Sequence, residues 1–119
     1  MIALGGALGA LARYQLAAMI QARVPLGFPW GTFVVNITGC LAMGVAATLI
    51  TDRVVVHPNW RFLIPIGFIG AYTTFSTFEY ETLRAIVEGS WMIGATNVIG
   101  SVLAGYLALW MGVVLARAL

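Results

Sequence analysis

The residues best suited to bind a ligand are concentrated in one short segment, GFIGAYTTFSTFEYETLR, which covers residues 67–84. Phe75 and Phe78 are three residues apart, so on a helix they share one face. Hydroxyl groups, which can donate hydrogen bonds, alternate with the two rings and belong to Thr73, Thr74, Ser76 and Thr77. Because aromatic ring edges carry positive quadrupole density, this face can line a path for a small anion. The alternative is that the rings pack in a protein core.

Two further polar residues lie in the middle of apolar runs. Arg13 interrupts the first run, where a membrane-embedded arginine is unfavourable by about 3 kcal/mol. It either extends its charged head to the membrane surface or provides a fixed positive charge that attracts an anion or anchors an acid. Asn36, within GTFVVNITG, offers two amide donors. These donors either join two helices or replace the water around an anion.

Two pairs near the end of the chain have a helical spacing. Asn97 and Ser101 are four residues apart, so they share a helix face, and with Gly105 they form a narrow polar stripe. This stripe either binds another helix or lines a water path. Glu81 and Arg84 are three residues apart, which predicts an ion pair that supports the local helix; the alternative is that Glu81 takes part in transport.

Several functions are excluded by what the sequence lacks. Six arginines oppose four acidic residues, whereas a nucleic-acid-binding surface needs a clustered basic face. No group of histidine, cysteine and carboxylate residues has the spacing of a metal site. Serine is not paired with histidine or lysine inside any apolar run. We therefore expect no nucleic-acid partner and no enzymatic activity.

The elements that must position these residues are membrane helices. Hydrophobic residues make up 61% of the 119-residue chain and charged residues 8%, against roughly 25% charged residues in a soluble domain. A spanning helix needs about 20 mostly apolar residues, and long stretches with few or no charged residues predict such spans near residues 2–20, 30–51, 61–87 and 90–116. We expect one all-α integral membrane domain over residues 1–119, surrounded by lipid, with loops near 21–29, 52–59 and 88–89.

The third predicted span is a poor continuous helix. It contains two glycines, Gly67 and Gly70, followed by a run of β-branched threonines, and both residue types weaken helices. Helices that break at membrane depth free backbone groups to line a cavity or bind an ion. Gly5 and Gly9 form a GxxxG pair, which predicts close helix packing. Four helices alone enclose little space, so a second subunit is expected.

The arginines give little instruction about orientation in the membrane. Four spans place both ends of the chain and the second loop on one side, together with Arg53, Arg61 and Arg117. The opposite side holds Arg23 and Arg84. Orientation follows the arginine and lysine bias of short loops, and a difference of one residue is small. We therefore expect the chain to insert in both orientations.

Three segments together resemble one family. They are GALGALARY (residues 6–14), GTFVVNITG (31–39) and GFIGAYTTFSTF (67–78), in this order, and they are similar to the Fluc, or CrcB-type, fluoride channels. The resemblance implies an antiparallel, dual-topology homodimer in the bacterial plasma (inner) membrane. It also implies two pathways for passive fluoride export and a role in fluoride resistance.

The resemblance also assigns roles to residues. It implies that a structural sodium ion at the dimer interface is bound by the backbone carbonyls of Gly70 and Thr73. The residues that we assign to the fluoride pathway are Asn36, Phe75, Ser76, Thr77, Phe78, Asn97 and Ser101. Arg13 and Glu81 are assigned to an anion vestibule or to a structural charge. Asn97 and Gly105 stand where relatives have a tyrosine and a serine, so the polar stripe of the fourth helix departs from the family pattern.

Two other functions fit parts of the sequence. Small multidrug exporters are also short four-helix proteins, but they need an acidic residue in the first helix, where this chain has Arg13 and no acid before Asp52. An assembly subunit without a transport role explains the glycine-rich packing. It does not explain polar residues inside several predicted spans.

Overall fold

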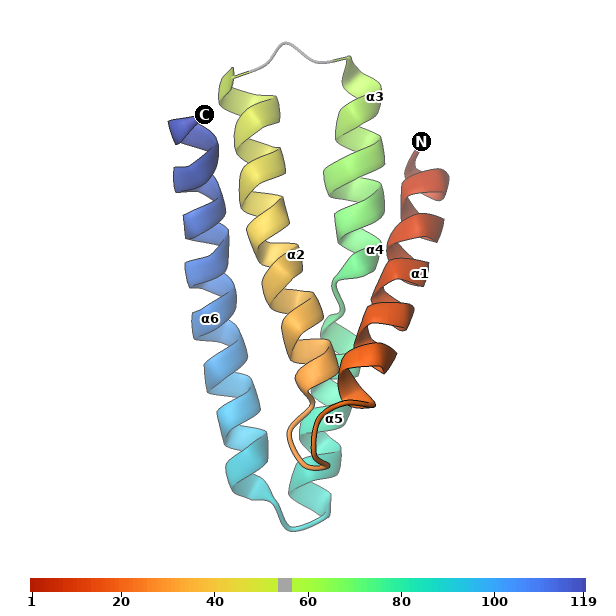
Figure 1. The fold of residues 1–119 in the computed structure, drawn as a ribbon, viewed down its shortest axis with the longest axis vertical. Helices are drawn as coiled ribbons and strands as arrows, with labels where there is room; N and C mark the ends of the chain where they lie inside the picture. The colour runs from red at the N-terminus through yellow and green to blue at the C-terminus, as the bar shows by residue number, and fades with distance from the viewer. Residues whose placement is uncertain (54–56) are drawn as a thin grey trace.

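The computed structural model describes residues 1–53 and 57–119, and the regular elements that these residues form are helices, with no β-strand among them. Figure 1 shows long helices side by side along one axis, with both ends of the chain at the same end of the molecule. In chain order the elements are α1 (Ile2–Gln21), α2 (Trp30–Thr48), η1 (Leu49–Arg53), α3 (Pro58–Arg61), η2 (Phe62–Ile69), α4 (Gly70–Tyr72), α5 (Phe75–Val87) and α6 (Trp91–Ala118).

Three helices in the described part of the chain are long and apolar enough to cross a membrane, namely Ile2–Gln21, Trp30–Asp52 and Trp91–Ala118. Large apolar side chains cover much of the outer surface, as expected where lipid is the solvent. Two exposed tryptophans of α6, Trp91 and Trp110, are about 28 Å apart at 1.5 Å per residue. That distance matches a hydrocarbon core of about 30 Å, and tryptophan prefers its two edges. The chain is therefore a multi-pass membrane protein.

Glycines bring the helices into close contact in two pairs. In the first pair α1 packs along η2, and a Cβ atom on Gly5 or Gly9 would overlap backbone carbonyl oxygens of η2. In the second pair α2 packs along α6, where Gly44 and Gly112 meet backbone to backbone. The tight packing predicted for Gly5 and Gly9 is confirmed.

The segment that follows α3 changes its helical geometry twice. From Phe62 to Ile69 it is π-helical and contains Pro65, which lacks the N–H that an α-helix would use at that position. After α4, Thr73 and Thr74 are extended, with φ/ψ of −84°/154° and −146°/120°. Thr74 then acts as the N-cap of α5, because its side chain accepts a hydrogen bond from the Thr77 N–H. Residues 73–74 therefore separate α4 from α5.

The predicted loops compare with the structure as follows. Residues 88–89 form the short turn between α5 and α6; Gly89 adopts a positive φ of 87°, and the N–H groups of Gly89 and Ser90 bond back to the last turn of α5. Of the second predicted loop, residues 54–56 lie outside the described residues. Its flanks are helical, because α2 continues into η1 and α3 begins at Pro58.

Candidate functional site

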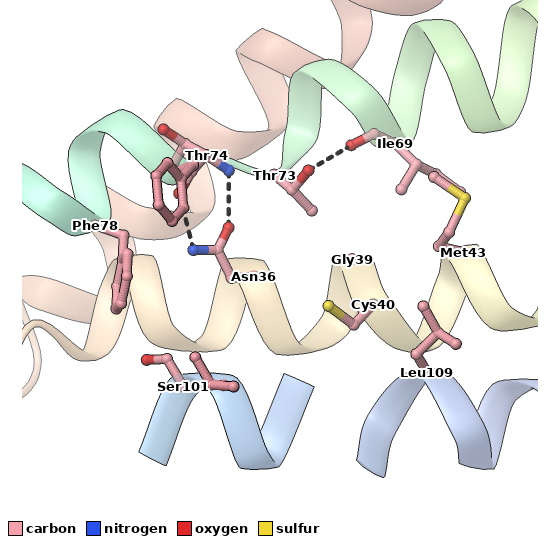
Figure 2. A pocket seen from close by; sticks show the side chains of 12 residues that line it. Asn36, Gly39, Cys40, Met43, Ile69, Thr73, Thr74, Phe78, Ser101 and Leu109 are labelled. Carbon is pink, nitrogen blue, oxygen red and sulfur yellow. Dashed lines mark hydrogen bonds between the residues drawn. The ribbon is translucent and has the colours of Figure 1, made fainter. Parts of the chain in front are cut away.

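An open cavity of about 380 Å³ lies where residues 73–74 face α2 and α6. Figure 2 shows polar side chains from three elements converging on it. Four of the predicted pathway residues line it, namely Asn36, Phe75, Phe78 and Ser101. The remaining lining residues are small or apolar except for two threonines, Thr73 and Thr74. The cavity therefore has a mostly apolar lining with a few hydrogen-bonding groups.

The two phenylalanines contribute differently to this wall. Their ring centroids are 5.8 Å apart and the ring planes are tilted by 40°, so they share a face, as the sequence predicts. Phe78 is 6% exposed, whereas Phe75 is 73% exposed. Phe78 is therefore packed in the wall of the cavity, and Phe75, in the first turn of α5, leaves most of its side chain exposed.

Asn36 is hydrogen-bonded to the backbone of Thr74 at both ends of its amide. Its Nδ2 donates to the Thr74 carbonyl at 3.0 Å, and the Thr74 N–H donates to Oδ1 at 2.8 Å. Both bonds are drawn in Figure 2. The side chain thus replaces the helical partners that the extended residues lose. An amide has two N–H donors, and the bond to the Thr74 carbonyl uses one of them.

Arg13 bonds the backbone just before the extended residues 73–74. Its Nε donates to the Ala71 carbonyl at 3.1 Å, so the side chain lies across α4. α1 and α2 therefore each supply one polar side chain to the backbone of residues 71–74. This geometry gives the embedded guanidinium a carbonyl partner, and the sequence alone did not indicate that partner.

A second cavity, of about 290 Å³, lies between α1, α2 and α5. Three predicted site residues line it, namely Arg13, Thr77 and Glu81. Thr32 donates from Oγ1 to Glu81 Oε1 at 2.9 Å, and among the described residues Glu81 Oε2 is buried without a hydrogen-bond partner. A buried acceptor without a partner is costly, which favours water or another polar occupant here.

The predicted ion pair between Glu81 and Arg84 is wrong. Arg84 instead pairs with Glu88, one turn further along α5, at 3.3 Å. Glu81 lies on the face that packs toward α2, where Thr32 is within hydrogen-bond reach. Side chains three or four residues apart can both meet on a helix. Here the contact of Glu81 with α2 leaves Glu88 as the partner of Arg84.

Asn97 lies between α5 and α6 and is 2% exposed. Its Nδ2 donates to Thr82 Oγ1 at 3.0 Å, and Ser101 Oγ donates to Asn97 Oδ1 at 3.2 Å. Thr82 in turn donates to the Phe78 carbonyl at 2.8 Å. Sequence reasoning missed Thr82; its position four residues after Phe78 was the available signal. Ser76 is exposed and lines neither cavity.

The carbonyls around residues 69–74 are used unequally. Ile69 O accepts hydrogen bonds from the N–H and the hydroxyl of Thr73, and those of Ala71 and Thr74 accept from Arg13 and Asn36. In the part of the chain that the structure describes, no hydrogen bond reaches the carbonyl oxygens of Gly70 and Thr73. Hard cations prefer oxygen ligands, so these two carbonyls fit the predicted sodium site.

Together, the helices and cavities define a class, that of small multi-pass membrane proteins with polar groups held inside an apolar helical frame. Comparison with known proteins gives the family. A family model described as "CrcB-like protein, Camphor Resistance (CrcB)" matches residues 1–113. The chain therefore belongs to the CrcB-like family.

Similar proteins from three bacteria carry one name, "Fluoride-specific ion channel FluC". The protein of Solibacter usitatus is 55% identical over 117 residues, which cover 98% of this chain and 96% of the relative. That of Acidobacterium capsulatum is 54% identical over 117 residues, covering 98% and 93%. That of Nitratidesulfovibrio vulgaris is 45% identical over 112 residues, covering 94% and 90%.

Proposed function

We propose that this chain is a fluoride-selective passive channel that exports fluoride across the bacterial inner membrane. The observation that carries the proposal is the cavity in which Phe78, Asn36 and Ser101 meet. Fluoride holds its water shell strongly, so a pore must replace that shell with ring edges and hydrogen-bond donors. The names of the relatives support the same ion.

The proposed channel has four membrane crossings in each chain. The third is the combination of α3, η2, α4 and α5, interrupted at residues 73–74. Such an interruption is tolerated at membrane depth only where the freed groups are buried or face a cavity. Here Arg13 bonds the Ala71 carbonyl, Asn36 bonds both backbone groups of Thr74, and a cavity adjoins the segment.

The proposed working unit is an antiparallel homodimer with two pathways. Phe75 is 73% exposed although it lines the cavity, so one chain alone leaves this wall open. A second copy in the opposite orientation closes it and brings a second pair of Gly70 and Thr73 carbonyls to the two-fold axis. The Gly70 and Thr73 carbonyls of both copies would then hold one sodium ion, and the ion would stabilise the dimer.

The test is ion efflux from vesicles that contain the purified protein. A fluoride electrode should record rapid efflux, while chloride efflux under the same gradient stays at the level of empty vesicles. Equal rates for the two anions, or no fluoride efflux, contradict the proposal. Uptake of an aromatic cation such as ethidium tests the multidrug-exporter alternative in the same vesicles. Such uptake without fluoride efflux favours the exporter.

A further inference from the structure

In the buried polar network of α5 and α6, each hydrogen bond has a defined donor and acceptor. This order affects how the proposed channel binds its ion. Its members are Phe78, Thr82, Asn97 and Ser101, which we call the α5–α6 network. Thr82 is 8% exposed and Asn97 2% exposed, so water does not substitute for their hydrogen bonds. Ser101 also lines the cavity shared with Phe78 and Asn36, so one end of the network reaches the cavity.

Each hydroxyl hydrogen in the network has one acceptor. A carbonyl can only accept, so Thr82 donates its single hydroxyl hydrogen to the Phe78 carbonyl at 2.8 Å. The contact of 3.0 Å between Thr82 and Asn97 therefore needs an N–H donor from Asn97. This fixes the orientation of the Asn97 amide and turns its oxygen toward Ser101. Ser101 must then donate its own hydrogen to that oxygen, at 3.2 Å.

This arrangement directs the lone pairs of the Ser101 hydroxyl, which do not bind an anion, toward the cavity. A serine hydroxyl has one hydrogen, and here Asn97 accepts it, so Ser101 presents lone pairs to the cavity. An anion that accepts the Ser101 hydrogen must first displace the Asn97 oxygen. That oxygen is then buried without a partner, which weakens anion binding.

We propose that Asn97 competes with the transported anion for the hydroxyl hydrogen of Ser101, and so determines how tightly the channel holds fluoride. The inference rests on the proposed function and adds to it a residue that sets the affinity for the transported anion. A channel must bind its ion well enough to admit it and weakly enough to release it. Asn97 weakens the hold at Ser101, because the protein re-forms the Ser101–Asn97 bond whenever the anion leaves.

A structural role alone makes a different prediction. If the network only joins α5 to α6, the two residues are still coupled through their shared hydrogen bond, but their removal disturbs the packing and should not tighten fluoride binding. Competition instead predicts that removal of Asn97 tightens fluoride binding, and only while the Ser101 hydroxyl is present. A double-mutant cycle on the half-saturating fluoride concentration measures both the direction of the change and its dependence on Ser101.

The experiment measures the fluoride concentration that half-saturates flux in vesicles for Asn97→Leu, Ser101→Ala and the double variant. Asn97→Leu should lower it by about fivefold, as expected for one competing hydrogen bond. Ser101→Ala should change it by less than about twofold alone and should reverse the decrease in the Asn97→Leu background. Thr96→Val, an exposed change on the same helix, is the matched control and should have no effect.

Two results would overturn the inference. One is a Ser101→Ala effect of the same size with and without Asn97. The other is a higher half-saturating concentration for an Asn97→Leu protein that still elutes as a dimer. Absence of fluoride flux in the unsubstituted protein contradicts the proposed function instead, and the inference is then decided by the next measurement.

A second measurement uses the unsubstituted protein, in case Asn97→Leu does not fold. The protein is labelled with ¹⁵N-asparagine in detergent, and the Asn97 side-chain signal is assigned by substituting Asn36 and Asn59. Fluoride, but not chloride, should shift the Asn97 signal, because Ser101 turns away from its oxygen. An Asn97 signal that does not shift with fluoride over the concentration range of the flux measurement overturns the inference.

Discussion

At the scale of single residues, the polar side chains within the membrane-facing helices mostly bind the protein itself. Asn36 and Arg13 bond backbone groups of residues 71–74, and Asn97 bonds Thr82 and Ser101. Polar groups in lipid need such partners, because no water replaces them. The same bonds fix the positions of the donors that remain, so the cavity is shaped before an ion arrives.

The aromatic pair gives the first prediction. Phe75→Ile and Phe78→Ile should each reduce fluoride efflux by at least about tenfold, because isoleucine keeps apolar bulk but removes the ring quadrupole. Size-exclusion chromatography should still show the dimer. Phe78→Ile should also lower the melting temperature, since Phe78 is already buried within one chain, at 6% exposure.

A matched control for the aromatic pair is Phe68→Ile. Phe68 stacks on Tyr72 with centroids 5.9 Å apart, and it does not line the cavity that Phe78 closes. Efflux should therefore survive in this variant. If both cavity variants transport at the normal rate, the rings serve packing alone.

Asn36 gives the second prediction. Asn36→Asp should stop fluoride efflux, because a carboxylate places a negative charge beside an anion path and loses the Nδ2 donor that bonds Thr74 O. Efflux from vesicles measures the first effect, and the melting temperature measures the second. Asn59→Asp, an exposed change near the start of α3, is the control and should transport normally. An Asn36→Asp protein with full flux would exclude Asn36 from the pathway.

At the scale of elements, the sequence predicted the helices better than their contacts. Length and hydropathy place the apolar runs, and α1, α2 and α6 lie where these runs predict them. The sequence could not predict that Arg84 pairs with Glu88 instead of Glu81, because Glu81 bonds Thr32 of a neighbouring helix. For the same reason the sequence indicated a polar stripe on α6 but not its partner Thr82.

Contact between α1 and η2 gives the third prediction. Gly9→Ala should lower the melting temperature in detergent by several degrees, because the new Cβ atom would overlap the Phe68 carbonyl oxygen and overpacking costs about 1–3 kcal/mol. Gly6→Ala is the matched control on the same helix, since a Cβ atom there meets no atom within 4 Å. Equal melting temperatures for the two variants would show that α1 does not pack on η2 in this way.

At the scale of the whole molecule, the proposed dimer joins the two features that one chain leaves incomplete. The cavity beside Phe75 is open on one side, and the carbonyls of Gly70 and Thr73 have no hydrogen-bond donor among the described residues. In the proposed dimer, a two-fold axis near residues 70–75 would close the first and double the second. The proposed cation site and the proposed pathway therefore depend on the same contact.

The cation gives the fourth prediction. Exchange of sodium for N-methylglucamine should lower the melting temperature of the dimer, because a ligand that binds only the folded assembly stabilises it in proportion to the logarithm of its concentration. Thr73→Val should respond to sodium as the unsubstituted protein does, since the proposed ligand is the backbone carbonyl and not the hydroxyl. A dimer whose melting temperature is the same in both salts has no structural sodium ion.

Orientation in the membrane gives the last prediction. Both ends of the chain lie at one end of the molecule (Figure 1), and the arginine count favours that end by three to two, from Arg53, Arg61 and Arg117 against Arg23 and Arg84. The charges of short loops set the orientation. A bias of one arginine is small, so one gene should give both orientations. Two added lysines, Ala118→Lys and Leu119→Lys, should therefore put nearly all copies in one orientation and remove fluoride resistance from cells.

Co-expression completes this test, because an antiparallel dimer needs one copy of each orientation. A second version carries Ala22→Lys and Leu26→Lys, at exposed positions of the first loop, and should insert the opposite way. Each version alone should leave cells sensitive to fluoride, and the two together should restore resistance, since only the mixture supplies both halves of the cavity. Accessibility labelling of each version checks its orientation. A single-orientation version that protects cells by itself would exclude the antiparallel dimer, because the pathway would then form from parallel copies or from one chain.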